Sequence, residues 1–201
     1  MKDATETGFL RGLDSHWVSK GKNSFAYQGV GLFDANGAGK ITEIAAGLKD
    51  LCYNVSVLAD SDSPSHFSEA HADELRAKGV TVTVWDGGVS IERRVFGDLP
   101  WPSVMASFEV ACLIRGDREE ILNQIGSQYG PAFDRNYAEW TDGPVLRDAL
   151  GKAAGASAWY KRQSWAQQWV DAISPHLDDI AFQGTDLSRK ICSIREWIDR
   201  A

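Results

Sequence analysis

The chain has 201 residues, enough for one large domain or for a smaller domain with an appendage. Hydrophobic residues make up 43% of it and eight residues are Trp, so the chain can bury a substantial core, and this excludes a globally disordered protein. The formal net charge of −7 argues against nucleic-acid binding by the whole surface. It does not exclude a nuclease, because acids that hold metal ions also lower the net charge.

The cysteines Cys52, Cys112 and Cys192 are widely separated, and no Cys-x-x-Cys or Cys/His cluster is present. The sequence therefore supports neither a disulfide framework nor a zinc site. No apolar run is long enough to cross a bilayer, and the N-terminus lacks the apolar core of a signal peptide. We expect a reduced, cytoplasmic protein without membrane contact.

The first half of the chain alternates helical and strand-like patterns. Apolar residues at helical spacing predict helices around residues 10–17, 41–48 and 67–75. Apolar runs between them predict strands over residues 30–33, 55–59 and 80–84. The last run alternates Val with Thr, which suits a half-exposed edge strand. Strand–helix repeats with short connections predict a parallel sheet flanked by helices.

The pattern becomes helical from about residue 99 onward. Helical spacing recurs around residues 110–114, 121–125, 145–150, 165–173 and 191–198, and Pro and Gly-Pro breakers fall between these stretches. The expected fold class is α/β, with an α/β core over residues 1–98 and a helical domain over residues 99–201.

Acidic residues follow two of the predicted strands. Asp34 and Asp60 each end such a strand, and ligands of open parallel sheets bind at that edge. Asp62 lies two residues beyond Asp60, so the two carboxylates can share a hard cation such as Mg²⁺. Taken alone, the segment Asp60-Ser-Asp-Ser-Pro64 is better explained as a polar turn.

The surrounding stretches change this assessment. Together, residues 29–40 (GVGLFDANGAGK), 53–64 (YNVSVLADSDSP), 85–94 (WDGGVSIERR) and 159–162 (WYKR) resemble the Toprim domain of the OLD (overcoming lysogenization defect) family nucleases. The resemblance covers most of the chain and is firmer in the first half. It implies a Toprim-like, Rossmann-like sheet and a DNA endonuclease that uses Mg²⁺ or Mn²⁺ in a two-metal mechanism. Such domains resemble parts of phage-defence or DNA-processing systems.

The resemblance also implies roles for individual residues. Asp60, Asp62 and Glu6 would form the core metal site, with Glu6 as a further ligand or a general base. Asp34 and Glu92 would complete a second site, because Glu92 matches an acid that the family uses for metal. Lys161 corresponds to the family's catalytic lysine. The cations predicted to contact DNA phosphates are Arg93, Arg94 and Arg162.

The sequence departs from the family at its start. A complete Toprim domain opens with a strand that leads into an E-G-x-x-E motif, whereas Lys2 stands where the first acid belongs. Asp3 is a candidate substitute for that acid, and either truncation or divergence explains the difference. The ATPase module usual in OLD proteins is not in this sequence, so we expect it in a missing N-terminal region or in a separate chain. A homodimer is a further expectation.

Each assigned residue has a simpler explanation. Glu6 suits the first turn of a helix because of the helix dipole, and Asp34 suits a turn before Gly37. Glu92 is otherwise a solvated or ion-paired helix acid, and Lys161 a solvated surface residue. Arg93 and Arg94 are otherwise partners of nearby acids.

Three functional alternatives stand beside the nuclease. The first is a phosphate-binding loop at residues 36–40, which we reject because the required Gly and the Ser or Thr are replaced by Asp34 and Ile41, so no ATP site is predicted. The second is another phosphoryl transfer by the same acids. The third is a degenerate Toprim domain that binds DNA or a protein partner without cleavage.

Overall fold

The computed structural model describes residues 4–201, so Lys2 and Asp3 lie outside the described residues. Its strands are β1 (Ser56–Ala59) and β2 (Thr81–Val84). The α-helices are α1 (Ala4–Ser19), α2 (Ile41–Asp50), α3 (Glu69–Ala77), α4 (Ile91–Asp98), α5 (Trp101–Arg115), α6 (Arg118–Tyr129), α7 (Pro144–Ala156), α8 (Gln163–Ile173) and α9 (Asp186–Arg200). Short 3-10 turns occupy Ala38–Lys40, Tyr137–Glu139, Ser174–His176 and Ile180–Phe182. The mixed, mostly helical content confirms the α/β class in general.

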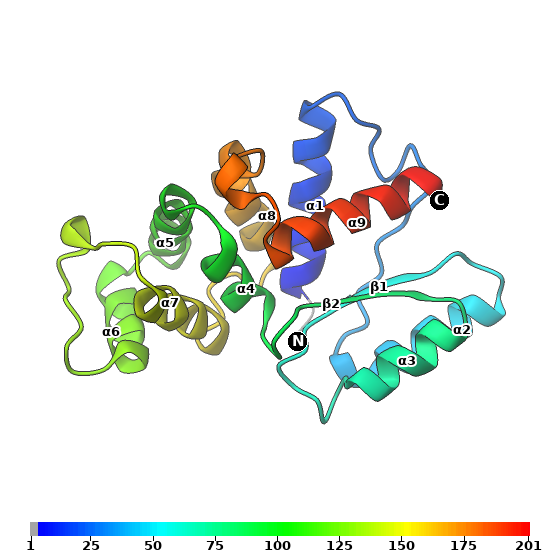
Figure 1. The fold of residues 1–201 in the computed structure, drawn as a ribbon, viewed down its shortest axis with the longest axis horizontal. Coiled ribbons are helices and arrows are strands. Elements are labelled where there is room, and N and C mark those ends of the chain that lie inside the picture. Colours follow the sequence, from blue (N-terminus) through cyan, green and yellow to red (C-terminus); the bar gives the residue numbers. More distant parts are fainter. Residues whose placement is uncertain (1–3) are drawn as a thin grey trace.

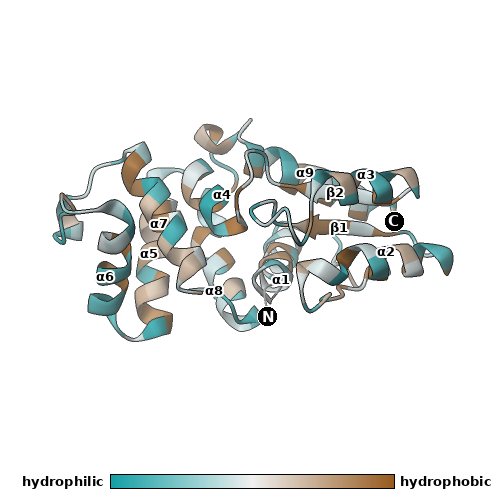
Figure 2. Cartoon of the chain, turned by 90° about the horizontal axis from the view of Figure 1, so that it is seen from below, coloured by the Kyte–Doolittle hydropathy of each residue, from teal (hydrophilic) through white to brown (hydrophobic). Residues whose placement is uncertain are grey.

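The strands β1 and β2 form a parallel pair, as predicted, in the register Ser56↔Thr81 to Ala59↔Val84. Helices α2 and α3 cover one face of this pair, and α1 and α9 lie on the other (Figure 1). Side chains of β1 alternate between the two faces. Val57 and Ala59 join an apolar cluster with α2 and α3, whereas Leu58 packs toward α1 and α9. The hydropathy view shows β1 as an apolar strand beside α2 (Figure 2).

The predicted strand over residues 30–33 is wrong. These residues run as an extended segment without strand pairing, and they lead into the turn that precedes α2. In the described chain, no backbone hydrogen bond joins residues 31–35 to β1. A strand exists only through its pairing with a neighbour, so an apolar run that has no partner stays irregular.

The largest apolar cluster lies among the helices. It takes Phe9 and Leu13 from α1, Trp85 from the turn after β2, and side chains of α4 to α9, so it crosses the predicted limit at residue 98. Aromatic rings fill its centre, and Tyr160 stacks on Trp169 at a ring-centroid distance of 4.0 Å. The domain limit stays a prediction.

Two helix pairs in this region approach so closely that they require glycine. A Cβ atom on Gly8 of α1 would lie 2.4 Å from the carbonyl oxygen of Gln163, where α8 begins. One on Gly12 would lie 2.4 Å from Cβ of Val170. In the second pair, a Cβ on Gly151 of α7 would lie 2.7 Å from Cα of Arg93 in α4. These contacts fix α1 and α4, the helices that carry Glu6 and Glu92.

Candidate metal centre

A cavity of about 570 Å³ brings together five residues to which the resemblance assigns metal or catalytic roles. They come from α1, from the turn after β1, from α4 and from the α7–α8 connection, namely Glu6, Asp60, Asp62, Glu92 and Lys161. The remaining lining residues are Ser90, Arg93, Gln128, Gly151, Lys152, Gly155 and Ala156. Segments up to about 150 residues apart in sequence therefore share one site.

Asp60 is held firmly in place at the carboxyl end of β1. Its Oδ1 atom accepts a hydrogen bond from Nε1 of Trp85 (3.1 Å) and another from the backbone N–H of Ile91 (2.7 Å). Trp85 is 1% exposed, so its indole ring is itself fixed by the core. Two donors on one oxygen orient the carboxylate, which is what a metal ligand needs from its surroundings.

The adjacent Ser61 joins the turn after β1 to the turn after β2. Its hydroxyl donates to the carbonyl oxygen of Trp85 (2.7 Å) and accepts from the N–H of Val89 (3.2 Å). The latter turn contains Gly87 and Gly88 at φ values of +82° and +65°, which L side chains rarely adopt. Residues 85–88 (WDGG) thus shape the backbone that leads into α4.

Glu92 occupies the first turn of α4, where Ser90 caps the helix by accepting from the N–H of Arg93. Its side chain is only 3% exposed, so it is not a solvated helix acid. Helix α7 backs onto it at Gly155, where a Cβ would lie 3.6 Å from Oε2 of Glu92. That distance is an ordinary van der Waals contact, so α7 packs directly against the carboxylate.

Lys161 faces the acids from the helical side. Two buried aromatic residues immediately before it anchor the α7–α8 connection. Nε1 of Trp159 donates to Oε1 of Gln124 (2.6 Å), and the hydroxyl of Tyr160 donates to the carbonyl oxygen of Ser107 (2.6 Å). This anchoring places the lysine close enough to Glu92 to lower the pKa of that carboxyl, against the effect of burial.

The acids raise one another's proton affinity. Burial, followed by the charges of Glu92 and Asp62, raises the pKa of Asp60 from 3.8 to about 8. Burial also raises the pKa of Glu92 above its usual value of 4.5. Charged carboxylates in such a place need a compensating cation, and strongly perturbed pKa values in a cavity are typical of functional sites.

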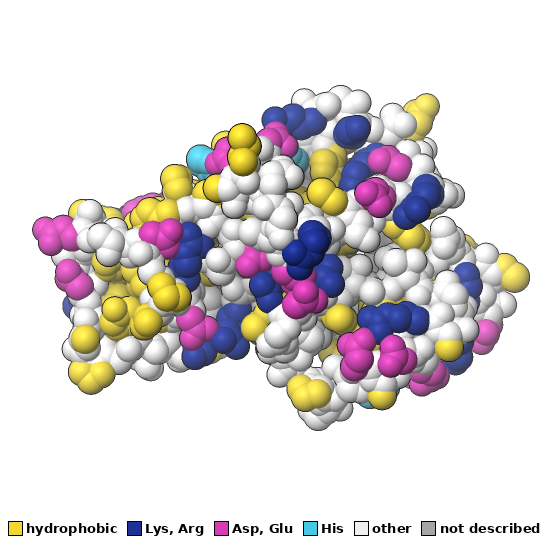
Figure 3. All heavy atoms as spheres, in the orientation of Figure 1, with side chains coloured by type: hydrophobic (Ala, Val, Ile, Leu, Met, Phe, Trp, Pro, Cys, Tyr) yellow, Lys and Arg dark blue, Asp and Glu magenta, His cyan; other side chains and the backbone are white. Residues whose placement is uncertain are grey.

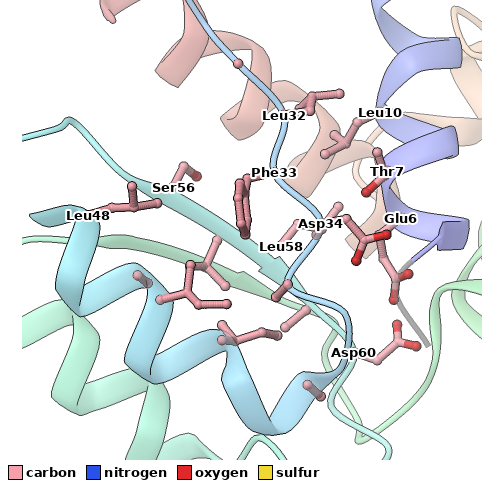
Figure 4. Close-up of a pocket in the computed structure, with 18 of the residues that line it drawn as sticks. Glu6, Thr7, Leu10, Leu32, Phe33, Asp34, Leu48, Ser56, Leu58 and Asp60 are labelled. Carbon is pink, nitrogen blue, oxygen red and sulfur yellow. The ribbon is translucent and has the colours of Figure 1, made fainter. Parts of the chain in front are cut away.

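Asp34 lies beside this group on a second, adjoining cavity, which Glu6, Asp60 and Asp62 also line. Figure 4 shows the side chains of Glu6, Asp34 and Asp60 together near the end of β1. Oδ1 of Asp34 also accepts from the backbone N–H of Asn36 (2.8 Å), so the residue shapes the turn as well. The extended segment therefore brings Asp34 to the predicted edge although it is not a strand.

The three predicted DNA-binding arginines lie in different surroundings. Arg93 lines the cavity and donates to Oδ1 of Asp148 through Nη2 (2.7 Å). Arg162 lies at the start of α8, with its guanidinium 4.3 Å from the ring centroid of Trp165. Arg94 lies outside the lining and pairs with Asp98 (3.1 Å) and Asp186 (3.2 Å). Figure 3 shows charges of both signs gathered near the start of α9, where Asp186 lies.

Sequence reasoning missed two further lining residues, Gln128 and Lys152. Lys152 extends from the exposed side of α7, and its Nζ lies 2.7 Å from Oδ2 of Asp148. Asp148 thereby bridges Lys152 and Arg93. The spacing of Asp148 and Lys152 looks like an ordinary helix ion pair, so only the tertiary structure places this lysine at the site.

The donor set fits a hard divalent cation. It consists of carboxylates, which Mg²⁺ and Mn²⁺ favour as ligands. The raised pKa values of Asp60 and Glu92 indicate that nearby positive charge does not fully balance these two buried carboxylates. Within residues 4–201, no three His, Cys, Asp or Glu side chains are already grouped closely enough to hold an ion. Coordination by these acids therefore stays a prediction.

Comparison with protein-family models, with curated proteins and with solved structures gives no match for the chain. Among the described residues, no helix is both long and apolar enough to cross a membrane.

Proposed function

We propose that this chain is a metal-dependent DNA endonuclease domain of the Toprim type found in OLD family nucleases. The observation that supports this best is the convergence of Glu6, Asp60, Asp62, Glu92 and Lys161 on one cavity. A polar turn at residues 60–64 would explain the two aspartates by themselves. It would not explain why a buried glutamate and a lysine from distant helices face them.

Asp60, Asp62 and Glu92 would hold the divalent cations, with Glu6 and Asp34 as further carboxylate ligands. Bound ions of this kind supply an activated water and neutralise charge on a phosphate. Asp60 is already oriented by Trp85 and Ile91, so it needs little rearrangement to bind.

Glu6 and Lys161 would handle the proton and the developing charge. Glu6 is 7% exposed and lines both cavities, which suits a general base that accepts a proton from the attacking water. Lys161 would stabilise negative charge on the phosphate or donate a proton to the leaving oxygen. Arg93 and Lys152 would bind neighbouring phosphates from the helical side of the cavity. An ATPase partner and a homodimer stay predictions.

The decisive experiment is cleavage of supercoiled plasmid with Mg²⁺ or Mn²⁺, compared with EDTA. The site variant is Asp60→Asn/Asp62→Asn. A matched control is Asp73→Asn/Glu74→Gln, which removes the same charge from exposed positions of α3. We expect metal-dependent nicking by the wild type and the control and none by the site variant.

Other outcomes contradict the proposal in different ways. Equal nicking by both variants would indicate a contaminating nuclease. No nicking by folded wild-type protein with either metal would favour the degenerate Toprim domain that binds DNA or a partner without cleavage.

A further inference from the structure

Asp60 uses one of its two carboxylate oxygens for contacts within the protein. Nε1 of Trp85 and the backbone N–H of Ile91 both donate to Oδ1, at 3.1 and 2.7 Å. A carboxylate oxygen has two lone pairs, so these two donors leave none on Oδ1 for a cation. Oδ2 is therefore the oxygen that Asp60 can offer to the two cavities that it lines.

Neither donor can easily move aside. Trp85 is 1% exposed, and its carbonyl oxygen accepts a hydrogen bond from the hydroxyl of Ser61 (2.7 Å). The second N–H belongs to Ile91, the first residue of α4, whose side chain is fully buried. If the carboxylate turned to present Oδ1 to a cation, an indole N–H and a backbone N–H would lose their partner inside the protein. Such a loss is unfavourable, so the orientation of Asp60 is fixed.

The other buried acid of the site is confined in a similar way. Glu92 is 3% exposed, and α7 packs against its carboxylate at Gly155. A Cβ on Gly151 of the same helix would lie 2.7 Å from Cα of Arg93, the residue after Glu92. Helix α4 therefore cannot shift along α7 to bring Glu92 into a new position. The site has rigid acids on two sides.

A rigid carboxylate that offers one oxygen suits some cations better than others. Ca²⁺ takes about six to eight oxygen ligands in a flexible geometry, and it often takes both oxygens of one carboxylate. Mg²⁺ takes about six ligands in octahedral geometry, retains several waters and needs only one or two carboxylates. Restricting Asp60 to Oδ2 thus withholds a ligand that Ca²⁺ would use and that Mg²⁺ does not need.

We propose that Trp85 determines the metal specificity of this centre, because its indole N–H, together with the N–H of Ile91, occupies Oδ1 of Asp60 and favours Mg²⁺ over Ca²⁺. This inference rests on the proposed function, since it takes Asp60 as a metal ligand. Trp85 does not line the cavity, so it is a positioning residue and acts through Asp60.

The test measures metal affinity in the absence of nucleic acid. Binding of Mn²⁺ to the whole chain is followed by EPR, and Mg²⁺ or Ca²⁺ displaces it in separate titrations, which give a Kd for each ion. The site variant is Trp85→Phe, which removes the indole N–H and keeps an aromatic ring. The matched control is Trp169→Phe, because Trp169 is equally buried and its Nε1 donates to Oγ of Ser107 (2.8 Å).

We expect Trp85→Phe to raise the affinity for Ca²⁺ relative to that for Mg²⁺ about tenfold, the usual size of such an effect from a residue behind a metal ligand. Trp169→Phe should leave this ratio unchanged. Thermal unfolding of each variant shows that it is folded before the titration.

A second pair of variants removes the other donor. Ile91→Pro deletes the N–H at the first position of α4, where Pro is favoured, and Ser90 before it is already extended (φ −77°, ψ 165°). Ile91→Ala loses the buried side chain but keeps the N–H, so it is the control. We expect Ile91→Pro to shift the ratio in the same direction as Trp85→Phe, and Ile91→Ala to leave it unchanged. If one site variant does not fold, the other decides.

Two outcomes would overturn this inference alone. Equal weakening of both ions in Trp85→Phe would show that the indole only supports the fold. An unchanged ratio in folded Trp85→Phe or Ile91→Pro would show that Oδ1 does not limit the ligand set.

Failure of the proposed function gives different results. No Mn²⁺ binding by the folded wild type would remove Asp60 as a metal ligand and overturn both proposals. The expected change in the ratio, without plasmid cleavage by the wild type, would support the role of Trp85 and overturn only the endonuclease.

Discussion

The molecule has a helical side, formed by α1 and α4 to α8, and a sheet side, formed by residues 31–34, α2, α3, β1 and β2. The two sides differ in how closely neighbouring backbone segments approach one another. On the helical side, Gly8, Gly12 and Gly151 are needed because a Cβ would collide with a neighbouring helix. On the sheet side, Gly31, Gly39 and Gly47 have nothing within 4 Å of a Cβ position. The helix contacts are closely packed, whereas the exposed glycines of the sheet side meet no neighbour and two cavities, of about 190 and 80 Å³, lie beside β1.

The candidate site lies where these two sides meet. Asp34, Asp60 and Asp62 come from the open sheet edge, whereas Lys161 and Lys152 come from the packed helices. Close packing positions a group to within fractions of an ångström, which catalysis needs. The open side can adjust when charge enters the site. We infer that the helices set the geometry and the sheet edge supplies the ligands.

Removing the charge of Lys161 should have the largest effect on the cleavage rate. If the proposed function holds, Lys161→Met should lower the cleavage rate about 10²–10³-fold, because it removes charge stabilisation in the transition state. Metal affinity, measured by titration calorimetry, should change little. Lys152→Met on the same side should mainly raise KM. Identical effects of the two variants would contradict the assigned roles.

Adding a methyl group to the closely packed side should destabilise the fold. Gly8→Ala places a Cβ 2.4 Å from a backbone oxygen of α8, and we expect a loss of about 2–4 kcal/mol in the free energy of unfolding. The same change at Gly47 in α2 meets nothing, and there we expect a gain of about 0.5–1 kcal/mol. Urea denaturation measures both. Equal losses would remove the contrast between the two sides.

The two adjacent arginines of α4 should separate stability from DNA binding. Arg94→Gln removes the nearest cation from Asp186, which is 7% exposed and keeps only longer contacts with Arg189 (3.5 Å) and Lys190 (3.8 Å), so we expect a loss of about 1–2 kcal/mol in unfolding free energy. Arg93→Gln should instead weaken DNA binding and reduce the salt slope of log K by about 1. A larger loss of stability in Arg93→Gln than in Arg94→Gln would contradict this assignment.

Stability should depend on pH through Asp60. Its pKa is about 8 in the folded state against 3.8 ordinarily, so between these values the folded state binds more protons than the unfolded state. Without divalent metal, stability should therefore fall as pH rises from about 4 to 8. Asp60→Asn keeps the acceptor for Trp85 and Ile91 and should flatten this dependence. At pH 8 it should raise the melting temperature by about 2–4 °C for each kcal/mol of relieved repulsion.

Thermal unfolding in EDTA between pH 5 and pH 9 measures this effect. The control is Asp73→Asn, an exposed acid of α3 that pairs with Arg76. A wild-type curve that keeps rising up to pH 8 would show that Asp60 is not held at a raised pKa.

Local pattern was enough to predict most elements of the chain. Helical spacing predicted α1 and α2 because periodic apolar side chains report a buried face directly. The parallel pair β1–β2 followed from alternation of strand and helix, and Asp60 from its place at a strand end. These features depend on a few consecutive residues, so they can be predicted without knowledge of the tertiary structure.

Tertiary structure decided the features that depend on distant partners. Residues 30–33 are apolar enough for a strand, yet no strand lies beside them to pair with. The burial of Glu92, the structural pairing of Arg94 and the presence of Lys152 at the cavity each depend on a helix far away in sequence. Pairing, burial and counter-charge are properties of two segments at once, so one segment's composition cannot specify them.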